Sequence, residues 1–242
     1  MKLPRTTSLV DDPGFSHVDI FFASSHSLDV SNHGFVTKDL VIVFSLPFQS
    51  NRIFPRTLFR RSGLLKEALE YAKSVELGED AKDVWVFDID ETLLSNVPYY
   101  ADHGFGQKEN ITPLLEVFDG VEFDKWVDKA MAPPIESNLK LYEEVLKLGL
   151  KVFLLTRGSE QQRGVTVANL INSGFQDWDK LILRATEDHG KLATIYKPEK
   201  RNEMVEEGYR ILGNSGDQWS DLLGSSVSIH SFKLPNPMYY IP

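Results

Sequence analysis

The strongest constraint on the fold is the regular alternation of short apolar segments with amphipathic helices after residue 60. Short segments rich in β-forming residues lie at 84–87, 150–155, 181–183 and 209–212. Apolar residues at helical spacing predict helices over about 62–75, 137–149, 159–174 and 198–208. This order is typical of an α/β fold, a parallel sheet with helices on both faces.

Residues 1–60 lack this pattern and differ in charge. They hold six Lys and Arg against five Asp and Glu, a net charge of +1, whereas residues 61–242 hold 20 against 30, a net charge of −10. We therefore predict an N-terminal segment, 1–60, without a recognised domain, followed by one domain over 61–242.

Composition and apolar patterning disfavour several classes of protein. The net charge of −9 disfavours a nucleic-acid binder, and the absence of cysteine excludes disulfides, thiolate nucleophiles and cysteine-ligated metals. The longest apolar stretch, 40–48, contains Ser45 and Pro47 and is too short to span a bilayer, so we interpret it as a partly buried strand. The first residues, MKLPRTTSLVDDPG, do not resemble a secretory signal.

Polar residues stand at or shortly after the ends of three of the predicted strands, and these are the candidate positions for chemistry. Asp88 follows the strand 84–87, Thr156 follows 150–155, and Asp217 closes the glycine-rich segment after 209–212. Because ligands bind parallel sheets at the carboxyl ends of the strands, we expect these three side chains to lie near one site.

Asp88 and Asp90 form the most informative pair. Two carboxylates that point into the same space repel each other unless a cation or a proton lies between them, which favours a hard divalent ion, most simply Mg²⁺. One carboxylate can attack a phosphorus atom, and the other can protonate the leaving oxygen and later deprotonate water. The alternative is an acidic turn in which Asp90 or Thr92 caps the next helix.

The remaining candidates are weaker when taken singly. The Thr156 hydroxyl can bind a phosphoryl oxygen, or it can be an ordinary turn residue. Asp217 can complete a metal site with Asp221 in support, or it can be a helix cap; the two glycines before it allow close approach of the backbone to a ligand.

A positive side chain is needed to neutralise a phosphate and the negative charge of Asp88. We choose Lys197, which precedes a helix that we expect to begin at Pro198. Lys191 and Lys200 are the rival lysines, and a solvated surface lysine is the alternative.

In order, the segments VFDIDETLLSN, VFLLTRG, YKPEKR and GNSGDQWSDLLG resemble the four motifs of the haloacid-dehalogenase-like phosphohydrolases. Together with the tail SFKLPNPMYYIP, they look like the plant acid phosphatase and vegetative storage protein family of that superfamily, subfamily IIIB. The resemblance covers about 61–242 and implies a haloacid-dehalogenase-like sheet and Mg²⁺-dependent hydrolysis of small phosphomonoesters.

The resemblance also implies roles for single residues. Asp88 would be the nucleophile and a metal ligand, Asp90 the general acid and base and a ligand through its backbone carbonyl, and Asp217 a further metal ligand, with Asp221 accessory. Thr156 and Lys197 would bind the phosphate.

The same family includes storage proteins, so a nutrient reservoir with weak or vestigial activity is the alternative function. Some of these relatives lack the nucleophilic aspartate, which this chain keeps as Asp88. The family suggests a vacuolar or extracellular location and often a homodimer, but residues 1–60 match neither its secretory signal nor its N-terminal helical region. A further alternative is an atypical gene product whose fold is impaired because residues 1–60 do not replace the family's N-terminal helices. We expect no membrane or nucleic-acid partner.

The segment 93–135 lies where this superfamily places a cap over the site. Five of its residues can either line an entrance and stack on an aromatic leaving group or simply pack the cap onto the core, and packing is slightly favoured. The residues concerned are Pro98, Tyr99, Tyr100, His103 and Phe105.

Overall fold

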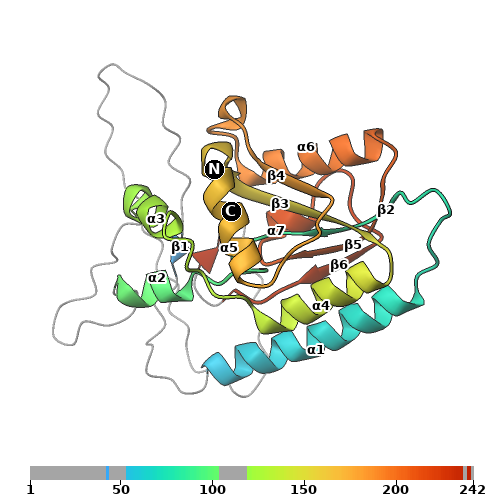
Figure 1. Ribbon diagram of the computed structural model, residues 1–242, viewed down its shortest axis with the longest axis horizontal. Coiled ribbons are helices and arrows are strands. Elements are labelled where there is room, and N and C mark those ends of the chain that lie inside the picture. The colour runs from blue at the N-terminus through green and yellow to red at the C-terminus, as the bar shows by residue number, and fades with distance from the viewer. Residues whose placement is uncertain (1–41, 44–52, 104–118, 237–238, 241–242) are drawn as a thin grey trace, which may run out of the picture. The chain divides into compact units, whose positions relative to one another are not determined.

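A computed structural model describes residues 42–43, 53–103, 119–236 and 239–240. Its main element is a five-stranded sheet in the order β4-β3-β2-β5-β6, in which all neighbouring strands are parallel (Figure 1). The strands are β2 (Asp83–Phe87), β3 (Lys151–Ser159), β4 (Lys180–Arg184), β5 (Arg210–Gly216) and β6 (His230–Lys233). The predicted parallel α/β sheet is confirmed.

Helices cover both faces of this sheet. The α-helices are α1 (Ile53–Ser74), α2 (Val97–Asp102), α3 (Gly120–Val127), α4 (Glu136–Lys147), α5 (Arg163–Asn172), α6 (Ala193–Glu206) and α7 (Trp219–Leu222). Helices α1 and α4 run side by side along one face, and α6 lies on the other (Figure 1). A short antiparallel pair joins β1 (Ile42–Val43) to β7 (Tyr239–Tyr240).

Strand β2 shows why the sheet needs both layers of helices. All five of its residues are buried. Trp85 and Phe87 belong to the core that α1 and α4 cover, whereas Val84 and Val86 belong to the core beneath α6. Successive side chains of a strand point to opposite faces, so a continuous apolar run requires a cover on each side.

Three details of the elements differ from the sequence-based expectations. Helix α1 begins at Ile53, nine residues before the predicted start, and β6 was not predicted. Helix α6 begins at Ala193, so the expectation that it starts at Pro198 is wrong, and the proline lies inside the helix. Pro198 cannot donate a backbone hydrogen bond, yet its buried ring packs closely against Gly224, which favours this position.

The remaining N-terminal expectations have different outcomes. The strand predicted within 40–48 is present as β1, at Ile42–Val43. The domain boundary near residue 60 stays a prediction. Within the described ranges, no helix has both the length and the apolarity that crossing a membrane requires.

Candidate active site

The candidate site lies at the carboxyl ends of the central strands. Asp88 directly follows β2, Thr156 lies in β3, and Asp217 directly follows β5. From β2 the strands are added on one side, β3 and then β4, and from β5 they are added on the other side, so the order of strands across the sheet switches between β2 and β5. Ligands of open α/β sheets bind at such a switch point, and Asp88 and Asp217 lie on its two sides.

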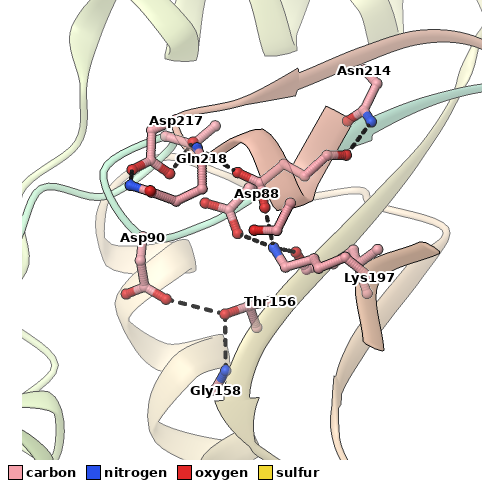
Figure 2. Close-up of polar contacts among 12 residues, drawn as sticks. Asp88, Asp90, Thr156, Gly158, Lys197, Asn214, Asp217 and Gln218 are labelled. Atoms are coloured by element: carbon pink, nitrogen blue, oxygen red, sulfur yellow. Dashed lines mark hydrogen bonds and ion pairs between the residues drawn. The ribbon is translucent and has the colours of Figure 1, made fainter. Parts of the chain in front are cut away.

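Lys197 links two of the acidic side chains (Figure 2). Its Nζ lies 2.5 Å from Oδ1 of Asp88 and 2.7 Å from Oδ1 of Asp221, and it also donates to the carbonyl of Leu155 at 2.8 Å. The lysine side chain is only 3% exposed. All three donors of the ammonium group therefore have partners, as a buried charge requires.

Asp217 lies beside this group and has several polar partners. Its Oδ2 accepts from Nε2 of Gln218 at 2.5 Å and from Nδ2 of Asn236 at 2.7 Å. The Thr92 hydroxyl lies 3.4 Å from Oδ1. The side chain is buried, so these donors take the place of water.

Three carboxylates converge on one small volume. Asp88, Asp217 and Asp221 each offer an oxygen, and these oxygens all lie within 4.8 Å of one another. Three ionised carboxylates and the one ammonium group of Lys197 leave a charge of −2, which a divalent cation balances. Carboxylate oxygens are the ligands that hard divalent cations prefer, so the residues present fit a metal ion.

The electrostatics of these groups show the same excess of negative charge. Burial, and then the charge of Asp221, raises the pKa of Asp88 well above its usual value, although Lys197 opposes this. Burial and Asp221 raise the pKa of Asp217 to about 6. Burial lowers the pKa of Lys197, but Asp221 and Asp88 outweigh it and raise that pKa above its ordinary value, so the lysine is charged.

The second carboxylate of the motif, Asp90, has different surroundings. It is half-buried, and its Oδ2 accepts from the Thr156 hydroxyl at 3.1 Å (Figure 2). Its Oδ1 accepts from Nδ2 of Asn96 at 3.0 Å. The amide N–H of Gly158 in turn donates to the Thr156 hydroxyl at 3.0 Å. Both oxygens of Asp90 are thus held by neutral donors.

Asn96 is held in place by the turn that precedes it. Glu91 has a φ of 56°, an uncommon conformation for a residue other than glycine, and its Oε1 accepts from the backbone N–H of Asn96 at 2.6 Å. Asn96 occupies the N-cap position of α2, but its side chain makes no cap hydrogen bond. The amide group serves Asp90 instead of the helix end.

Asp221 is positioned by tight packing and by a buried arginine. A Cβ atom at Gly216 would overlap the side chain of Asp221, so only glycine fits there. From the next turn of α6 after Lys197, Arg201 donates to the backbone carbonyls of Asp221 at 2.5 Å, of Ser220 at 3.3 Å and of Leu223. Helix α6 therefore holds Asp221 twice: Lys197 pairs with the Asp221 side chain, and Arg201 donates to the Asp221 backbone carbonyl.

The structure separates the three candidate lysines. Lys191 pairs with Asp188 and Glu199, both at 2.8 Å. Lys200 pairs with Glu203 at 2.9 Å. Of these three lysines, Lys197 is the one that the structure places on Asp88.

The aromatic residues of the cap segment pack against one another. Tyr99 and Tyr100 are buried, and the ring of Tyr99 lies 4.1 Å from that of His103, 5.1 Å from that of Phe123 and 5.8 Å from that of Trp126. Packing is therefore the role that the structure supports for these residues. Pro98 is exposed, and Phe105 lies outside the described residues.

Sequence reasoning missed several polar residues of the site. Asn96, Gln218 and Asn236 each donate to a predicted site carboxylate. Neutral amides have no strong sequence signal of their own. Asn236 lies in the tail SFKLPNPMYYIP, and the family resemblance of that tail is the one signal in the sequence that points to it.

The chain is similar in sequence to known plant proteins. The chain is 70% identical over 175 residues to acid phosphatase 1 of Solanum lycopersicum, covering 72% of this chain and 66% of that protein. It is 40% identical over 179 residues to vegetative storage protein 1 of Arabidopsis thaliana, covering 73% and 62%. The chain thus spans about two thirds of the length of these curated relatives.

A solved structure shares the fold. The class C acid phosphatase from Bacillus anthracis with tungstate bound superposes with a TM-score of 0.57 at 21% identity, covering 80% of this chain and 82% of that one. A family model described as HAD superfamily, subfamily IIIB (acid phosphatase), matches residues 59–242. The chain therefore belongs to subfamily IIIB of the HAD superfamily, the acid phosphatase family.

Proposed function

We propose that this protein is a Mg²⁺-dependent acid phosphatase that hydrolyses small phosphomonoesters through an aspartyl-phosphate on Asp88. The observation that carries the proposal is the pairing of Asp88 with Lys197 at 2.5 Å inside a buried cluster of three carboxylates. A lysine that neutralises one oxygen helps to keep a buried carboxylate ionised, and only an ionised carboxylate is a nucleophile. Membership of the acid phosphatase family supports the same activity.

In the first step, an oxygen of Asp88 attacks the phosphorus atom, and the bond from phosphorus to the ester oxygen breaks. Asp90 gives its proton to the leaving oxygen, so an alcohol departs and Asp88 carries the phosphoryl group. This step needs the carboxyl group of Asp90 in its protonated form.

In the second step, Asp90 takes a proton from a water molecule, and the water oxygen attacks the phosphorus atom. The bond from phosphorus to Asp88 then breaks, which releases inorganic phosphate and restores both carboxyl groups to their starting states. Thr156 and Asn96, which hold the two Asp90 oxygens, orient the carboxyl group for both transfers.

Asp88 and Asp217 would hold the metal ion together with the backbone carbonyl of Asp90. Both oxygens of Asp221 already have protein partners, Lys197 and the backbone N–H of Gln218, which suits a supporting role. When bound, Mg²⁺ supplies positive charge that stabilises the oxygens of the transferring phosphoryl group.

Lys197 and Thr156 would bind the phosphate. The ammonium group of Lys197 lies against Asp88, so its charge would stabilise a phosphoryl group on that residue. A hydrogen bond from Lys197 to a phosphoryl oxygen would replace one of its three present partners. The Thr156 hydroxyl has one hydrogen, which it now donates to Asp90. A phosphoryl oxygen would therefore compete with Asp90 for that hydrogen bond.

A storage role with weak or vestigial activity is the second candidate, because this chain is 40% identical to vegetative storage protein 1 of Arabidopsis thaliana. The presence of Asp88 in the buried cluster favours catalysis. A role as a nutrient reservoir does not require an ionised buried nucleophile.

The test is turnover of p-nitrophenyl phosphate by the purified full chain, with and without a chelator. We expect turnover in Mg²⁺, loss on chelation and recovery when Mg²⁺ is added back in excess. Absence of turnover in Mg²⁺ would favour the storage role, and full turnover in the chelator would remove the metal from the mechanism.

A further inference from the structure

The two oxygens of Asp217 have unequal surroundings. Oδ2 accepts two amide hydrogen bonds, from Gln218 at 2.5 Å and from Asn236 at 2.7 Å. Oδ1 has the Thr92 hydroxyl at 3.4 Å, longer than a usual hydrogen bond between oxygens. Among the neutral donors, the two shorter hydrogen bonds are therefore those to Oδ2. Asp88 also interacts with the Asp217 carboxyl group.

The second amide reaches Asp217 because the chain after β6 is fixed across the end of β5. The backbone N–H of Leu234 donates to the carbonyl of Gly216 at 2.9 Å, and Leu234 is buried. Nζ of Lys233 donates to the backbone carbonyls of Asp217 at 2.5 Å and of Leu234 at 2.9 Å. Residues 233–236 thus bind both the backbone and the carboxylate of Asp217, which directly follows β5.

We propose that Asn236 is a positioning residue that holds Oδ2 of Asp217 so that Oδ1 is presented to the cation. This inference rests on the proposed metal-dependent function. Residues 233–236 lie 16 to 19 positions after Asp217. The inference assigns them a part in metal binding that the spacing of the site motifs does not indicate.

The chemistry of an amide suits this task. The amide of Asn236 orients a carboxylate by hydrogen bonding but adds no charge, so the full negative charge of Asp217 stays available to the cation. A lysine at the same position would neutralise that charge and compete with the metal. Partners that orient metal-binding carboxylates in this way usually change metal affinity about 10- to 100-fold when they are removed.

The test compares Asn236→Ala and Asn236→Leu with the unaltered chain. The leucine nearly preserves the volume but cannot donate, and Asn172→Ala, at an exposed asparagine that ends α5, is the matched control. After chelation and dialysis, titration calorimetry with MgCl₂ alone measures the dissociation constant without substrate. Turnover of p-nitrophenyl phosphate at saturating Mg²⁺ then gives kcat.

We expect both Asn236 variants to raise the Mg²⁺ dissociation constant about tenfold, while kcat at saturating Mg²⁺ stays within about twofold of the unaltered value. The control should bind Mg²⁺ as the unaltered chain does. Unchanged Mg²⁺ affinity in folded Asn236 variants would overturn the inference, as would loss of the folded circular dichroism spectrum in both, because the residue would then be structural.

The same experiment separates this inference from the proposed function. An unaltered chain that binds no Mg²⁺ contradicts both. An unaltered chain that binds Mg²⁺ but has no turnover contradicts the function alone, and the effect of the Asn236 variants on affinity still decides the inference.

Discussion

Asp88 and Asp90 are two residues apart in the sequence but have opposite surroundings. Asp88 is buried among charges, with Lys197 at 2.5 Å and two further carboxylates nearby. Asp90 is half-buried, and the side chains that hold its oxygens, Thr156 and Asn96, are neutral. A nucleophile has to be ionised. Burial raises the pKa of Asp88 and Lys197 opposes that rise, so the proposed role also needs the positive charge of a bound cation. An acid and base has to exchange protons with the leaving group and with water, which suits the half-buried Asp90.

The largest effect should come from Asp88→Asn. An amide of nearly the same shape cannot attack phosphorus, so we expect turnover to fall by at least about 10³-fold while the far-ultraviolet circular dichroism spectrum is unchanged. Turnover of p-nitrophenyl phosphate measures this. Retained turnover would show that Asp88 is not the nucleophile and would end the distinction drawn between the two carboxylates.

Lys197→Met should lower both turnover and stability. The variant leaves Asp88 and Asp221 buried without their cation, so we expect a loss of about 3 kcal/mol in the free energy of unfolding in the metal-free protein, measured by urea denaturation. Turnover should fall at least about 100-fold.

Lys200→Met is the matched control for this variant. Lys200 lies on the same helix and pairs with Glu203 at 2.9 Å rather than with a site residue. An effect of Lys200→Met equal to that of Lys197→Met would contradict the choice of Lys197.

Asp90→Asn should have an effect that depends on the leaving group. The variant cannot donate a proton, so hydrolysis of an alkyl phosphate such as glycerol phosphate should fall about 10³-fold. The first step with p-nitrophenyl phosphate should fall less, because p-nitrophenolate leaves without help, and a burst of p-nitrophenol should precede slow turnover. Equal losses with both substrates and no burst would place Asp90 outside proton transfer.

The smallest effect concerns the stability of the metal-free protein between about pH 4 and pH 6. The pKa of Asp217 is raised from 3.8 to about 6, so the folded state binds a proton more tightly than the unfolded state does. The contribution of Asp217 is fully favourable below about pH 4 and is lost as the pH rises through 6.

In the presence of a chelator, the melting temperature of the unaltered chain should therefore fall by several degrees more across this range than that of Asp217→Asn, which does not titrate. Subtracting the two curves cancels the effect of titrating groups that do not interact with Asp217, so the difference reports Asp217 together with the carboxylates beside it. A rise instead of a fall in this difference would contradict the direction of the Asp217 shift.

Much of the fold was predictable because it depends on local patterns. The segment 84–87 is continuously apolar, since a central parallel strand is buried on both faces, and it appears as β2. Strand β6, with the sequence HSFK, was missed because an edge strand need not be apolar throughout. The start of α6 was missed because proline usually marks a first turn, whereas here it packs inside the helix against Gly224.

The residues at the ends of strands can be identified from the sequence, because strand periods and glycine-rich turns are properties of neighbouring residues. The sequence thereby selected Asp88, Thr156 and Asp217 as candidates. Only the tertiary structure decided which partners they meet. Lys197 reaches Asp88 across 109 residues, and Asn236 reaches Asp217 from beyond the next strand. Such pairings depend on the order of strands in the sheet and on which helix covers each face, and no local pattern encodes them.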